Sequence, residues 1–294
     1  MPYLRKPKWL TSKKIGASKA QEIKRLLRAY NLLTVCESAR CPNLGECFEK
    51  GTATFMILGN ICTRNCTFCA VEKSFENLLP PDAEEPRSIA ELSKKLGLKH
   101  IVITTVTRDD LPDGGASQFI EVINQIRKIC EKNISIEVLI SDFNGDLKQI
   151  IKVVDAAPDI LNHNVETIPR LYSYVRPKAD FKRSISVLHT ARKTNRNTLL
   201  KSGFMVGLGE TEKEVFALLE ELRKVDVDIV TIGQYMQPSK NHFPVNEYIH
   251  PEVFDYYKNE GEKMGFKIVE SAPLVRSSYH AERARKIMRN HSQI

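Results

Sequence analysis

Short apolar runs typical of buried β-strands alternate with helical segments from residue 54 to residue 233. The six strand-like runs are residues 54–58, 100–105, 134–140, 159–164, 198–206 and 227–233. Residues 117–131 and 211–225 lie between runs, and each carries one apolar stripe at helical spacing. Strands that alternate with helices are joined by right-handed crossovers and lie parallel in one sheet. The alternation therefore predicts an α/β fold, and it leaves open a doubly wound sheet and a full or partial barrel.

The chain is predicted to have a central domain and two extensions. With 294 residues, it is long enough for one large hydrophobic core or for two modest domains. No linker rich in proline or serine interrupts the alternating stretch, so we interpret residues 51–235 as one domain. Residues 1–50 then form an N-terminal extension that carries cysteines, and residues 236–294 form a C-terminal extension.

The composition predicts a soluble protein of a reducing compartment. No apolar run approaches the roughly 18 to 20 residues that span a membrane, and the basic N-terminus lacks the apolar stretch of a secretory signal. Six of the seven cysteines lie between Cys36 and Cys69, inclusive, which indicates metal binding rather than a disulfide scaffold. We therefore expect a cytoplasmic protein that has no membrane partner.

The formal net charge is +8, because 44 Lys and Arg residues exceed 36 Asp and Glu residues. This surplus favours acidic partners such as nucleic acid, an anionic membrane surface or an acidic protein, and it also suits a merely soluble surface. No appended RNA-binding domain is visible in the sequence, so we expect no nucleic-acid partner.

The strongest local signal is a downstream triplet, Cys62, Cys66 and Cys69, spaced C-x3-C-x2-C just after the first strand-like run. In parallel α/β folds, the loops that leave the carboxyl ends of strands build the active site. Three thiolates can ligate three irons of a [4Fe-4S] cluster and leave the fourth iron open to a substrate. A zinc site would more often have paired C-x2-C ligands or a nearby histidine, and this stretch has neither.

An upstream triplet, Cys36, Cys41 and Cys47, is spaced C-x4-C-x5-C. One cluster cannot use six thiolates, so the alternatives for these three are zinc binding, simple burial and a second iron-sulfur cluster. Three cysteines within 12 residues, beside the turn residues Pro42 and Gly45, make chance packing a poor explanation. We therefore favour a second cluster.

Two triplets of these spacings, in this order, resemble the lipoyl synthases, a family of radical S-adenosylmethionine enzymes, and the resemblance covers most of the chain. Further matching motifs are Lys6-Pro-Lys-Trp-Leu10, Arg108-Asp-Asp110, Asp113-Gly-Gly115, Asn162-His-Asn-Val-Glu-Thr167, Lys201-Ser-Gly-Phe-Met-Val-Gly-Leu-Gly-Glu210, Gly233-Gln-Tyr235 and Arg276-Ser-Ser-Tyr-His280. The resemblance implies a partial parallel (β/α)6-type barrel with an N-terminal cysteine-rich extension and a C-terminal extension.

The resemblance also implies two [4Fe-4S] clusters and S-adenosylmethionine as cofactors. The cluster on the downstream triplet would cleave S-adenosylmethionine to a 5′-deoxyadenosyl radical. An auxiliary cluster on the upstream triplet would give up two sulfur atoms to C6 and C8 of a protein-bound N6-octanoyl-lysine. In this family the auxiliary cluster has a serine as its fourth ligand, which corresponds to Ser278 here. An alkoxide is a hard ligand on a metal that prefers thiolate, so its bond should open readily.

The partners implied by the resemblance are of three kinds. The substrates would be octanoylated lipoyl-carrier domains, namely 2-oxoacid dehydrogenase E2 subunits and the glycine cleavage H protein. A low-potential donor such as flavodoxin or ferredoxin would supply electrons. Iron-sulfur carrier proteins would supply clusters.

Four polar residues near the ends of predicted strands are candidates for binding S-adenosylmethionine. Asn164 and Glu166 lie at the end of one run, and Lys201 and Gln234 lie near other strand ends. Each could be an ordinary turn or strand residue, but the carboxyl edge of a parallel sheet is the expected active-site face, and the family match favours a cofactor contact.

The remaining motifs are not assigned to the site. The run from Gly203 to Gly209 resembles a phosphate loop only loosely and lacks the G-x-G-x-x-G spacing, so we reject dinucleotide binding. Six thiolates leave no need for an imidazole ligand. The histidines are therefore interpreted as surface or core residues, and they include His163, His189, His242 and His280.

Two other functions are compatible with parts of the sequence. One is another sulfur-inserting radical enzyme, similar to tRNA methylthiotransferases or to biotin synthase, and the upstream triplet together with Arg276-Ser-Ser-Tyr279 argues against it. The other is a non-catalytic iron-sulfur electron carrier or nucleic-acid-binding module. The clusters of such a protein would be fully ligated and would not react with S-adenosylmethionine.

Overall fold

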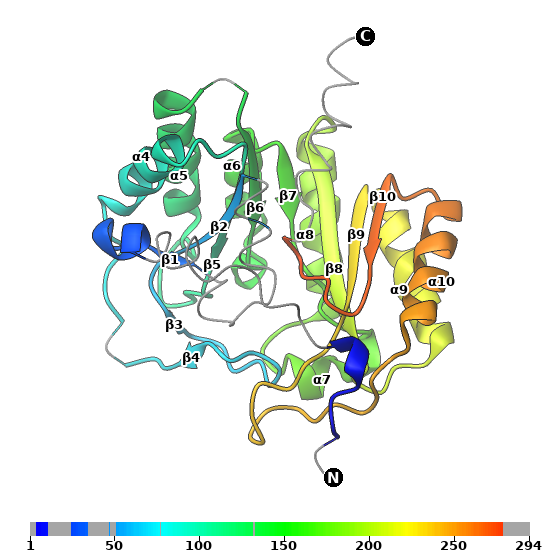
Figure 1. The fold of residues 1–294 in the computed structure, drawn as a ribbon. Coiled ribbons are helices and arrows are strands. Elements are labelled where there is room, and N and C mark those ends of the chain that lie inside the picture. The colour runs from blue at the N-terminus through cyan, green and yellow to red at the C-terminus, as the bar shows by residue number, and fades with distance from the viewer. Residues whose placement is uncertain are drawn as a thin grey trace. The chain divides into compact units, whose positions relative to one another are not determined.

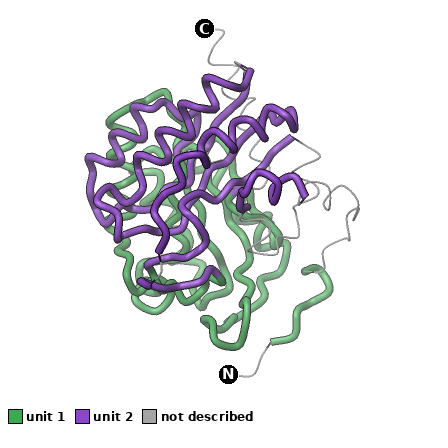
Figure 2. The backbone as a smooth tube through the Cα atoms, turned by 90° about the vertical axis from the view of Figure 1, so that its left-hand side faces the viewer, with its two compact units in different colours: residues 1–11, 64–70, 162–277 green, residues 12–63, 71–161, 278–294 purple. Residues whose placement is uncertain are grey.

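The structure, a computed structural model of the full chain, describes residues 4–10, 25–34, 47, 51–76, 78–131 and 133–278. The chain forms two compact units (Figure 2). Unit 1 consists of residues 1–11, 64–70 and 162–277, and unit 2 consists of residues 12–63, 71–161 and 278–294. No helix in these described ranges is both long and apolar enough to cross a membrane.

Unit 2 contains a mostly parallel sheet (Figure 1). Its strands run in the order β1 (Leu33–Thr34), β2 (Thr52–Ile57), β5 (His100–Thr105), β6 (Ser135–Leu139) and β7 (Ile160–Asn162), the last of which ends at the first residue of unit 1. β2 pairs with β5 and β5 pairs with β6 in parallel, whereas the short β1 pairs with β2 in antiparallel fashion. Every residue of β2 is buried, as expected for a parallel strand that is covered on both faces.

Unit 2 also contains two more strands and several helices. A separate parallel pair joins β3 (Ile61–Cys62) to β4 (Glu72–Lys73). The helices of its described residues include α4 (Glu85–Lys95), α5 (Ala116–Ile129) and α6 (Leu147–Asp155), with the 3-10 turn η2 (Phe143–Gly145). α5 buries Phe119, Val122, Ile123 and Ile126, so its core face is the apolar stripe that the sequence predicts.

Unit 1 contains three parallel strands in the order β8 (Leu199–Val206), β9 (Ile229–Gln234) and β10 (Ile268–Ser271). Its helices are η1 (Lys8–Leu10), η3 (Pro169–Leu171), α7 (Tyr172–Val175), α8 (Phe181–Thr194), α9 (Glu212–Lys224) and α10 (Pro251–Lys263). α9 and α10 lie beside β9 and β10 (Figure 1). Their apolar residues share one core with the strands, and this core includes Leu218, Leu222, Val230, Phe254 and Val269.

The predicted α/β class is confirmed. The six strand-like runs correspond to β2, β5, β6, β7, β8 and β9, and the two predicted helices correspond to α5 and α9. Six is the number of strands that a (β/α)6-type partial barrel requires. β10 is not predicted, because four residues give too short a pattern to recognise. It adds a strand to the sheet from a segment beyond residue 235. The predicted boundaries of the central domain, at residues 50 and 235, stay predictions.

Candidate active site

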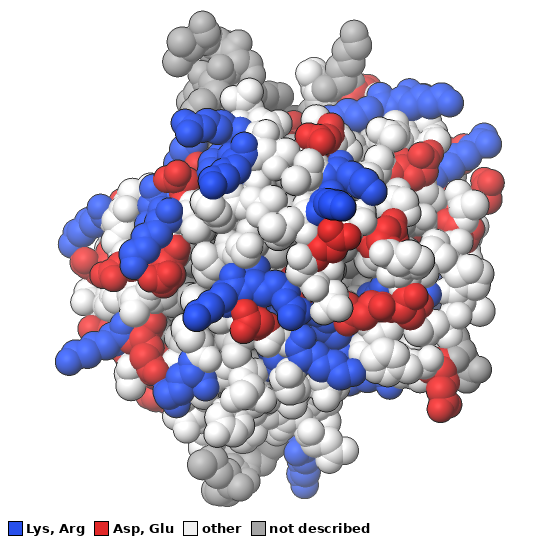
Figure 3. Space-filling model, turned by 180° about the vertical axis from the view of Figure 1, so that it is seen from behind, with Lys and Arg blue, Asp and Glu red and all other residues white. Residues whose placement is uncertain are grey.

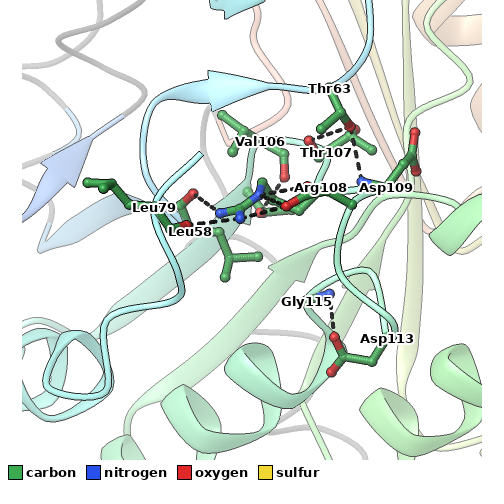
Figure 4. Close-up of polar contacts among 11 residues, drawn as sticks. Leu58, Thr63, Leu79, Val106, Thr107, Arg108, Asp109, Asp113 and Gly115 are labelled. Atoms are coloured by element: carbon green, nitrogen blue, oxygen red, sulfur yellow. Dashed lines mark hydrogen bonds and ion pairs between the residues drawn. The ribbon is translucent and has the colours of Figure 1, made fainter. Parts of the chain in front are cut away.

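Cys62 is the last residue of β3 and is half-buried. Its carbonyl accepts a hydrogen bond from the amide of Ser74 at 3.1 Å. The next residue, Thr63, is buried, and its amide and hydroxyl both donate to the carbonyl of Thr107, at 2.9 and 3.0 Å. The Thr63 hydroxyl also accepts from the amide of Asp109 at 3.0 Å (Figure 4). The backbone of Cys62 is therefore held on both sides.

The turn that holds Thr63 follows β5 and is itself fixed by Arg108 (Figure 4). This side chain is 3% exposed and donates to the carbonyls of Leu58, at 3.3 Å, and Leu79, at 2.9 Å. Its Nε and Nη2 atoms each lie 2.8 Å from the Asp110 carboxylate. The hydrogen bond from Arg108 holds the pKa of Asp110 below its usual range. The Arg108-Asp-Asp110 motif thus joins three loops of unit 2.

Asp113 and the glycines that follow it form the start of α5. One Asp113 oxygen accepts from the amide of Gly115 at 2.9 Å, and the other accepts from the amide of Ser117 at 2.8 Å. Gly115 has φ 90°, and a Cβ at this position would lie 2.2 Å from Cδ1 of Leu58. A residue without Cβ is therefore required for the start of α5 to lie against the end of β2.

Cys66 and Cys69 lie in one turn of unit 1, where the Cys69 amide donates to the Cys66 carbonyl at 3.3 Å. Both residues are half-buried. Thr67 attaches this turn to the end of α7. Its amide donates to the carbonyl of Val175 at 2.9 Å, and its hydroxyl donates to the carbonyl of Tyr174 at 2.7 Å.

The segment after β9 supports the same turn. The amide of Phe243 donates to the carbonyl of Thr67 at 2.9 Å, and Nε2 of His242 lies 3.1 Å from the carbonyl oxygen of Cys69. A carbonyl oxygen can only accept, so Nε2 of His242 carries the proton. The other ring nitrogen, Nδ1, lies 2.8 Å from the hydroxyl of Ser239. Both nitrogens of His242 thus bind protein atoms.

Glu166 follows β7 and adds one bridge to β8 in unit 1. Its amide donates to the carbonyl of Gly203 at 3.0 Å, and its carbonyl accepts from the amide of Met205 at 2.9 Å. Its φ is 65°, a left-handed conformation that is uncommon for a residue with a Cβ atom. Residues in such conformations cluster at functional sites, and the role of Glu166 in binding S-adenosylmethionine stays a prediction.

Arg176 provides the positive charge of this region and is buried. Its Nη1 atom donates to the Asn164 carbonyl and to the Tyr172 hydroxyl, both at 3.1 Å. Burial raises the pKa of Glu166, and the charge of Arg176 and a hydrogen bond with Asn164 partly offset this effect. Burial also opposes the charge of Arg176, but three neighbours outweigh it and raise the pKa of Arg176. These neighbours are Tyr172, Glu166 and Cys66.

Gly203 brings β8 close to two polar side chains. A Cβ on Gly203 would lie 2.3 Å from Oγ1 of Thr231 and 2.9 Å from Oδ1 of Asn164. That Asn164 oxygen is buried and has no hydrogen-bond partner among the described residues. Buried polar atoms are almost always paired in proteins, so an oxygen of this kind beside a glycine suits a site where a polar ligand binds.

Lys201 and Gln234 are both buried, but only Gln234 lies at the carboxyl end of its strand, the edge on which the sequence analysis expects the active site. Lys201 is 2% exposed, near the start of β8, and Gln234 is 1% exposed, at the end of β9. The side-chain amide of Gln234 donates to the carbonyls of Tyr235 and Glu247, both at 3.0 Å, and its oxygen accepts from the amide of Ile249 at 2.8 Å. A ligand contact by Gln234 would have to replace one of these bonds.

The glycine-rich run after β8 binds a carboxylate of its own. The amides of Gly207 and Leu208 donate to the two oxygens of Glu210, at 2.5 and 2.9 Å. Burial raises the pKa of Glu210, although these hydrogen bonds oppose the effect. The amides that would hold a phosphate group in a phosphate loop are therefore occupied, which agrees with the rejection of a dinucleotide site.

The predicted auxiliary site lies only partly within the described residues. Cys36 and Cys41 lie outside them, whereas Cys47 and Ser278 are both half-buried residues of unit 2. The motif that leads to Ser278 begins in unit 1, where a Cβ on Gly233 would lie 2.3 Å from the carbonyl oxygen of Val275. Gly233 therefore allows the chain just before this motif to lie against β9.

No three His, Cys, Asp or Glu side chains of the described ranges are gathered closely enough to hold one metal ion. The fit of the downstream triplet to an iron-sulfur cluster rests on its donor set, which is three half-buried thiols within eight residues on a loop with a fixed backbone. The fit of S-adenosylmethionine rests on the buried Asn164 oxygen, which has no hydrogen-bond partner among the described residues.

Comparison with known proteins agrees with these features. A family model of the radical SAM superfamily matches residues 56–232. A lipoyl synthase of Caldanaerobacter subterraneus subsp. tengcongensis is 54% identical over 279 residues, which cover 95% of this chain and 96% of that protein. A lipoyl synthase of Caldicellulosiruptor saccharolyticus is also 54% identical, over 98% of this chain and 100% of its own length.

Two solved structures resemble this chain in fold at low sequence identity. Methylornithine synthase (PylB) is 12% identical with a TM-score of 0.55, and the match covers 95% of this chain and 90% of that one. HydG, a maturase of the [FeFe]-hydrogenase, is 16% identical with a TM-score of 0.57, and the match covers 92% of this chain and 75% of that one.

The parallel sheet and the matched family model define the class of this protein, the radical S-adenosylmethionine enzymes. The curated relatives identify one family within this class. Because more than half of the aligned residues are identical over nearly the whole length, the chain belongs to the lipoyl synthase family.

Four residues that contact the cysteine loop or its surroundings were not among the predicted site residues. They are Thr63, Thr67, Arg176 and His242. Three of them act on backbone carbonyls far along the chain, with separations of 44 residues for Thr63, 107 for Thr67 and 173 for His242. Periodicity and motif spacing do not report such contacts. The sequence does contain one signal, because a threonine directly follows both Cys62 and Cys66.

Proposed function

We propose that this chain inserts sulfur at C6 and C8 of an octanoyl group carried on the N6 atom of a lysine in a carrier protein. The observation that carries the proposal is the 54% identity to a curated lipoyl synthase over 98% of the chain. When bound, S-adenosylmethionine and its cluster supply a radical that removes hydrogen from the octanoyl chain, and an auxiliary cluster supplies sulfur.

In this proposal Cys62, Cys66 and Cys69 hold three irons of one [4Fe-4S] cluster and leave the fourth iron to S-adenosylmethionine. Two observations support the assignment. The donor set consists of thiols, which iron-sulfur clusters prefer. The backbone of the loop is held by Thr63 and Thr67, so the loop loses little conformational entropy when the three ligands bind iron.

The proposed contacts to S-adenosylmethionine come from unit 1. Asn164 offers a buried oxygen that can accept a hydrogen bond, and the glycine at position 203 allows β8 to lie close to it. Burial raises the pKa of Glu166 and Arg176 offsets this only in part, and the Glu166 side chain can accept a hydrogen bond from an ammonium or hydroxyl donor in either protonation state. Lys201 would supply a positive charge for a carboxylate.

Gln234 is the fourth proposed contact to S-adenosylmethionine, and it has the least support of the four. Its side chain already bonds to the backbone at four positions. It would act mainly by holding the segment around residue 247 against the end of β9.

Cys36, Cys41, Cys47 and Ser278 are the proposed ligands of the auxiliary cluster. The placement of Cys47 and Ser278 in the same compact unit is compatible with a shared site. The three thiols would bind iron firmly, and the serine oxygen would bind it weakly, because a hard alkoxide is a poor match for iron that prefers thiolate. A weak bond at that position would allow the cluster to be opened for its sulfur.

The proposed partners follow from the same reaction. The carriers are octanoylated lipoyl-carrier proteins, such as 2-oxoacid dehydrogenase E2 subunits and the glycine cleavage H protein. Flavodoxin or ferredoxin would donate electrons, and iron-sulfur carrier proteins would supply clusters. The proposal includes no nucleic acid and no membrane, and it assigns the reaction to the cytoplasm.

The reaction is tested by anaerobic incubation of the reconstituted protein with S-adenosylmethionine, a reductant and an octanoyl-lysyl peptide, followed by mass spectrometry. We expect a peptide that has gained two sulfur atoms, and that has also lost two hydrogens once its two thiols are oxidised to the disulfide. Formation of 5′-deoxyadenosine without a sulfur-containing peptide would contradict the proposed substrate. If S-adenosylmethionine is not cleaved at all, the protein is a non-catalytic iron-sulfur protein.

The two-cluster assignment is tested by iron analysis of the same preparation. We expect about 8 irons per chain, and about 4 after replacement of the downstream triplet by alanine. The matched control replaces the upstream triplet, which should also leave about 4 irons but should preserve cleavage of S-adenosylmethionine. Stoichiometric zinc, or a single cluster in the parent protein, would contradict the assignment.

A further inference from the structure

We propose that Thr63 and Thr67 are positioning residues, which fix the backbone of the cysteine loop in advance of cluster binding. The proposal rests on the proposed function, because it concerns the loop to which that function assigns the radical-generating cluster.

The two threonines make the same kind of contact at two separate places. Each directly follows a cysteine of the downstream triplet. The amide and hydroxyl of Thr63 both donate to the carbonyl of Thr107. The amide and hydroxyl of Thr67 donate to the neighbouring carbonyls of Val175 and Tyr174. A threonine that directs both donors at one distant loop fixes the backbone torsions next to the preceding cysteine.

Thr63 is the more tightly held of the two. Its side chain is 1% exposed, and its hydroxyl donates to Thr107 while it accepts from the amide of Asp109 (Figure 4). The turn that binds the Thr63 hydroxyl is itself held by Arg108, which donates hydrogen bonds to the carbonyls of Leu58 and Leu79. This arrangement gives the Arg108-Asp-Asp110 motif a function, because the motif fixes the turn to which Thr63, the residue after Cys62, is hydrogen-bonded.

Thr67 is held by a smaller set of contacts within unit 1. It is half-buried, its hydroxyl bond to Tyr174 is 2.7 Å long, and its carbonyl accepts from the amide of Phe243. The end of α7 and the segment after β9 therefore both hold this residue. Because Cys66 and Cys69 flank Thr67 within a single turn, the two cysteines share this support.

A fixed loop matters because a cluster needs three thiolates at set positions. A loop that samples many conformations loses that freedom when it binds iron, and the loss weakens the binding. A loop that is already fixed avoids most of this loss, which is the general advantage of preorganisation. Each threonine hydroxyl should therefore slow the release of iron without touching the iron itself.

The first experiment uses the cluster-free full-length chain and so does not depend on the proposed reaction. We compare Thr63→Val and Thr67→Val, in which a methyl group replaces the hydroxyl, by the rate at which iodoacetamide modifies each cysteine, followed by peptide mass spectrometry. We expect Thr63→Val to speed modification of Cys62 about tenfold and to leave Cys69 unchanged. Thr67→Val should speed modification of Cys69 about tenfold and leave Cys62 unchanged.

Two further variants separate positioning from general stability. Thr63→Ser keeps the hydroxyl and should restore the parent rate at Cys62. Thr105→Val removes a hydroxyl of β5 that bonds to the carbonyls of Ile57 and Val106 and not to the cysteine loop, so it should behave as the parent. The thermal unfolding midpoint of every variant is measured alongside. Parent-like modification rates in both valine variants, or the same increase in Thr105→Val, would overturn the proposal.

The second experiment measures release of iron to a chelator from full-length protein whose upstream triplet is replaced by alanine. We expect release to be about tenfold faster in Thr63→Val and Thr67→Val, and unchanged in Thr63→Ser. Equal release rates in all variants would overturn the positioning claim. If the parent protein holds no iron on the downstream triplet, the proposed function fails, and the modification rates of the cluster-free chain still decide the role of the threonines.

Discussion

Ser278 follows Arg276 and Ser277 in a motif at the start of unit 2's last segment, and it is half-buried. As a weak oxygen ligand of the auxiliary cluster, it would set how easily that cluster opens. Replacement by cysteine supplies a thiolate, which binds iron more firmly. We therefore expect Ser278→Cys to keep both clusters and to cleave S-adenosylmethionine, while transfer of sulfur to the octanoyl chain slows at least tenfold.

The measurement follows 5′-deoxyadenosine and the sulfur-containing peptide together in a single turnover. Ser277→Cys is the matched control, and it should behave as the parent protein. Full product at the parent rate from Ser278→Cys would mean that a labile serine bond is not part of the reaction. Normal behaviour in Ser278→Ala as well would move the assignment away from this residue.

Gly203 is a second residue at which one added carbon atom, the Cβ of alanine, should weaken the binding of S-adenosylmethionine. A Cβ there would lie 2.3 Å from Oγ1 of Thr231 and 2.9 Å from Oδ1 of Asn164, so Gly203→Ala forces both side chains to shift and displaces the Asn164 oxygen that is proposed to bind S-adenosylmethionine. We expect this variant to lose stability and to bind S-adenosylmethionine at least tenfold more weakly. The reconstituted iron content should stay at the parent value.

A double variant separates the two effects of the added methyl group. Gly203→Ala with Thr231→Ala removes the nearer clash, so the thermal unfolding midpoint should recover, whereas the affinity for S-adenosylmethionine should not. Equilibrium dialysis of the reconstituted proteins measures that affinity. If affinity recovers together with stability, the Asn164 oxygen is not part of the cofactor site.

At the scale of elements, the start of α9 depends on one carboxylate. The Thr211 hydroxyl and the Glu214 carboxylate form a capping box, and Arg170 donates to both Glu214 oxygens, at 2.7 and 3.0 Å. The hydrogen bond from Arg170, with smaller contributions from Thr211, lowers the pKa of Glu214 to about 2. Since this pKa is below the usual value, the ionised group stabilises the fold above about pH 4.5.

The corresponding test compares Glu214→Gln with the parent chain. At pH 7 we expect the variant to unfold with a free energy lower by about 0.5 to 1 kcal/mol, a modest value because the pair is partly exposed. The difference should shrink as the pH falls from about 4.5 towards 2, where Glu214 of the parent takes up a proton. Urea unfolding of the cluster-free protein at several pH values measures it, and a difference that stays constant down to pH 2 would falsify this account.

The elements differ in how well the sequence predicts them. β5 is predicted to the residue, because its buried positions form a continuous apolar and β-branched run. The two-residue strands β3 and β4 are not predicted, since pairing of such short segments depends on the loops around them. Residue type and spacing were enough to identify the cysteine loop. The supports of that loop could not be found in this way, because Thr63, Thr67 and Arg108 bond to backbone groups that only the fold brings near.

At the scale of the whole molecule, the net charge of +8 favours an acidic carrier protein. On the face drawn in Figure 3, Lys and Arg side chains are interspersed with Asp and Glu, and they form no continuous basic surface there. A mixed surface with a net positive charge still attracts an acidic domain over distances comparable to the Debye length. The contribution of surface charge to docking should therefore come from the overall surplus of positive charge, and it should weaken as salt is added.

We expect binding of an octanoylated acidic carrier domain to weaken by about tenfold between low salt and about 0.5 M salt, mainly through a slower association rate. The measurement is surface plasmon resonance under anaerobic conditions, with the carrier domain immobilised. A carrier domain whose surface carboxylates are replaced by amides is the matched control, and it should lose most of the salt dependence. Association that is equally fast at all ionic strengths would show that contacts other than long-range charge select the carrier, and it would leave the proposed chemistry of the downstream triplet unchanged.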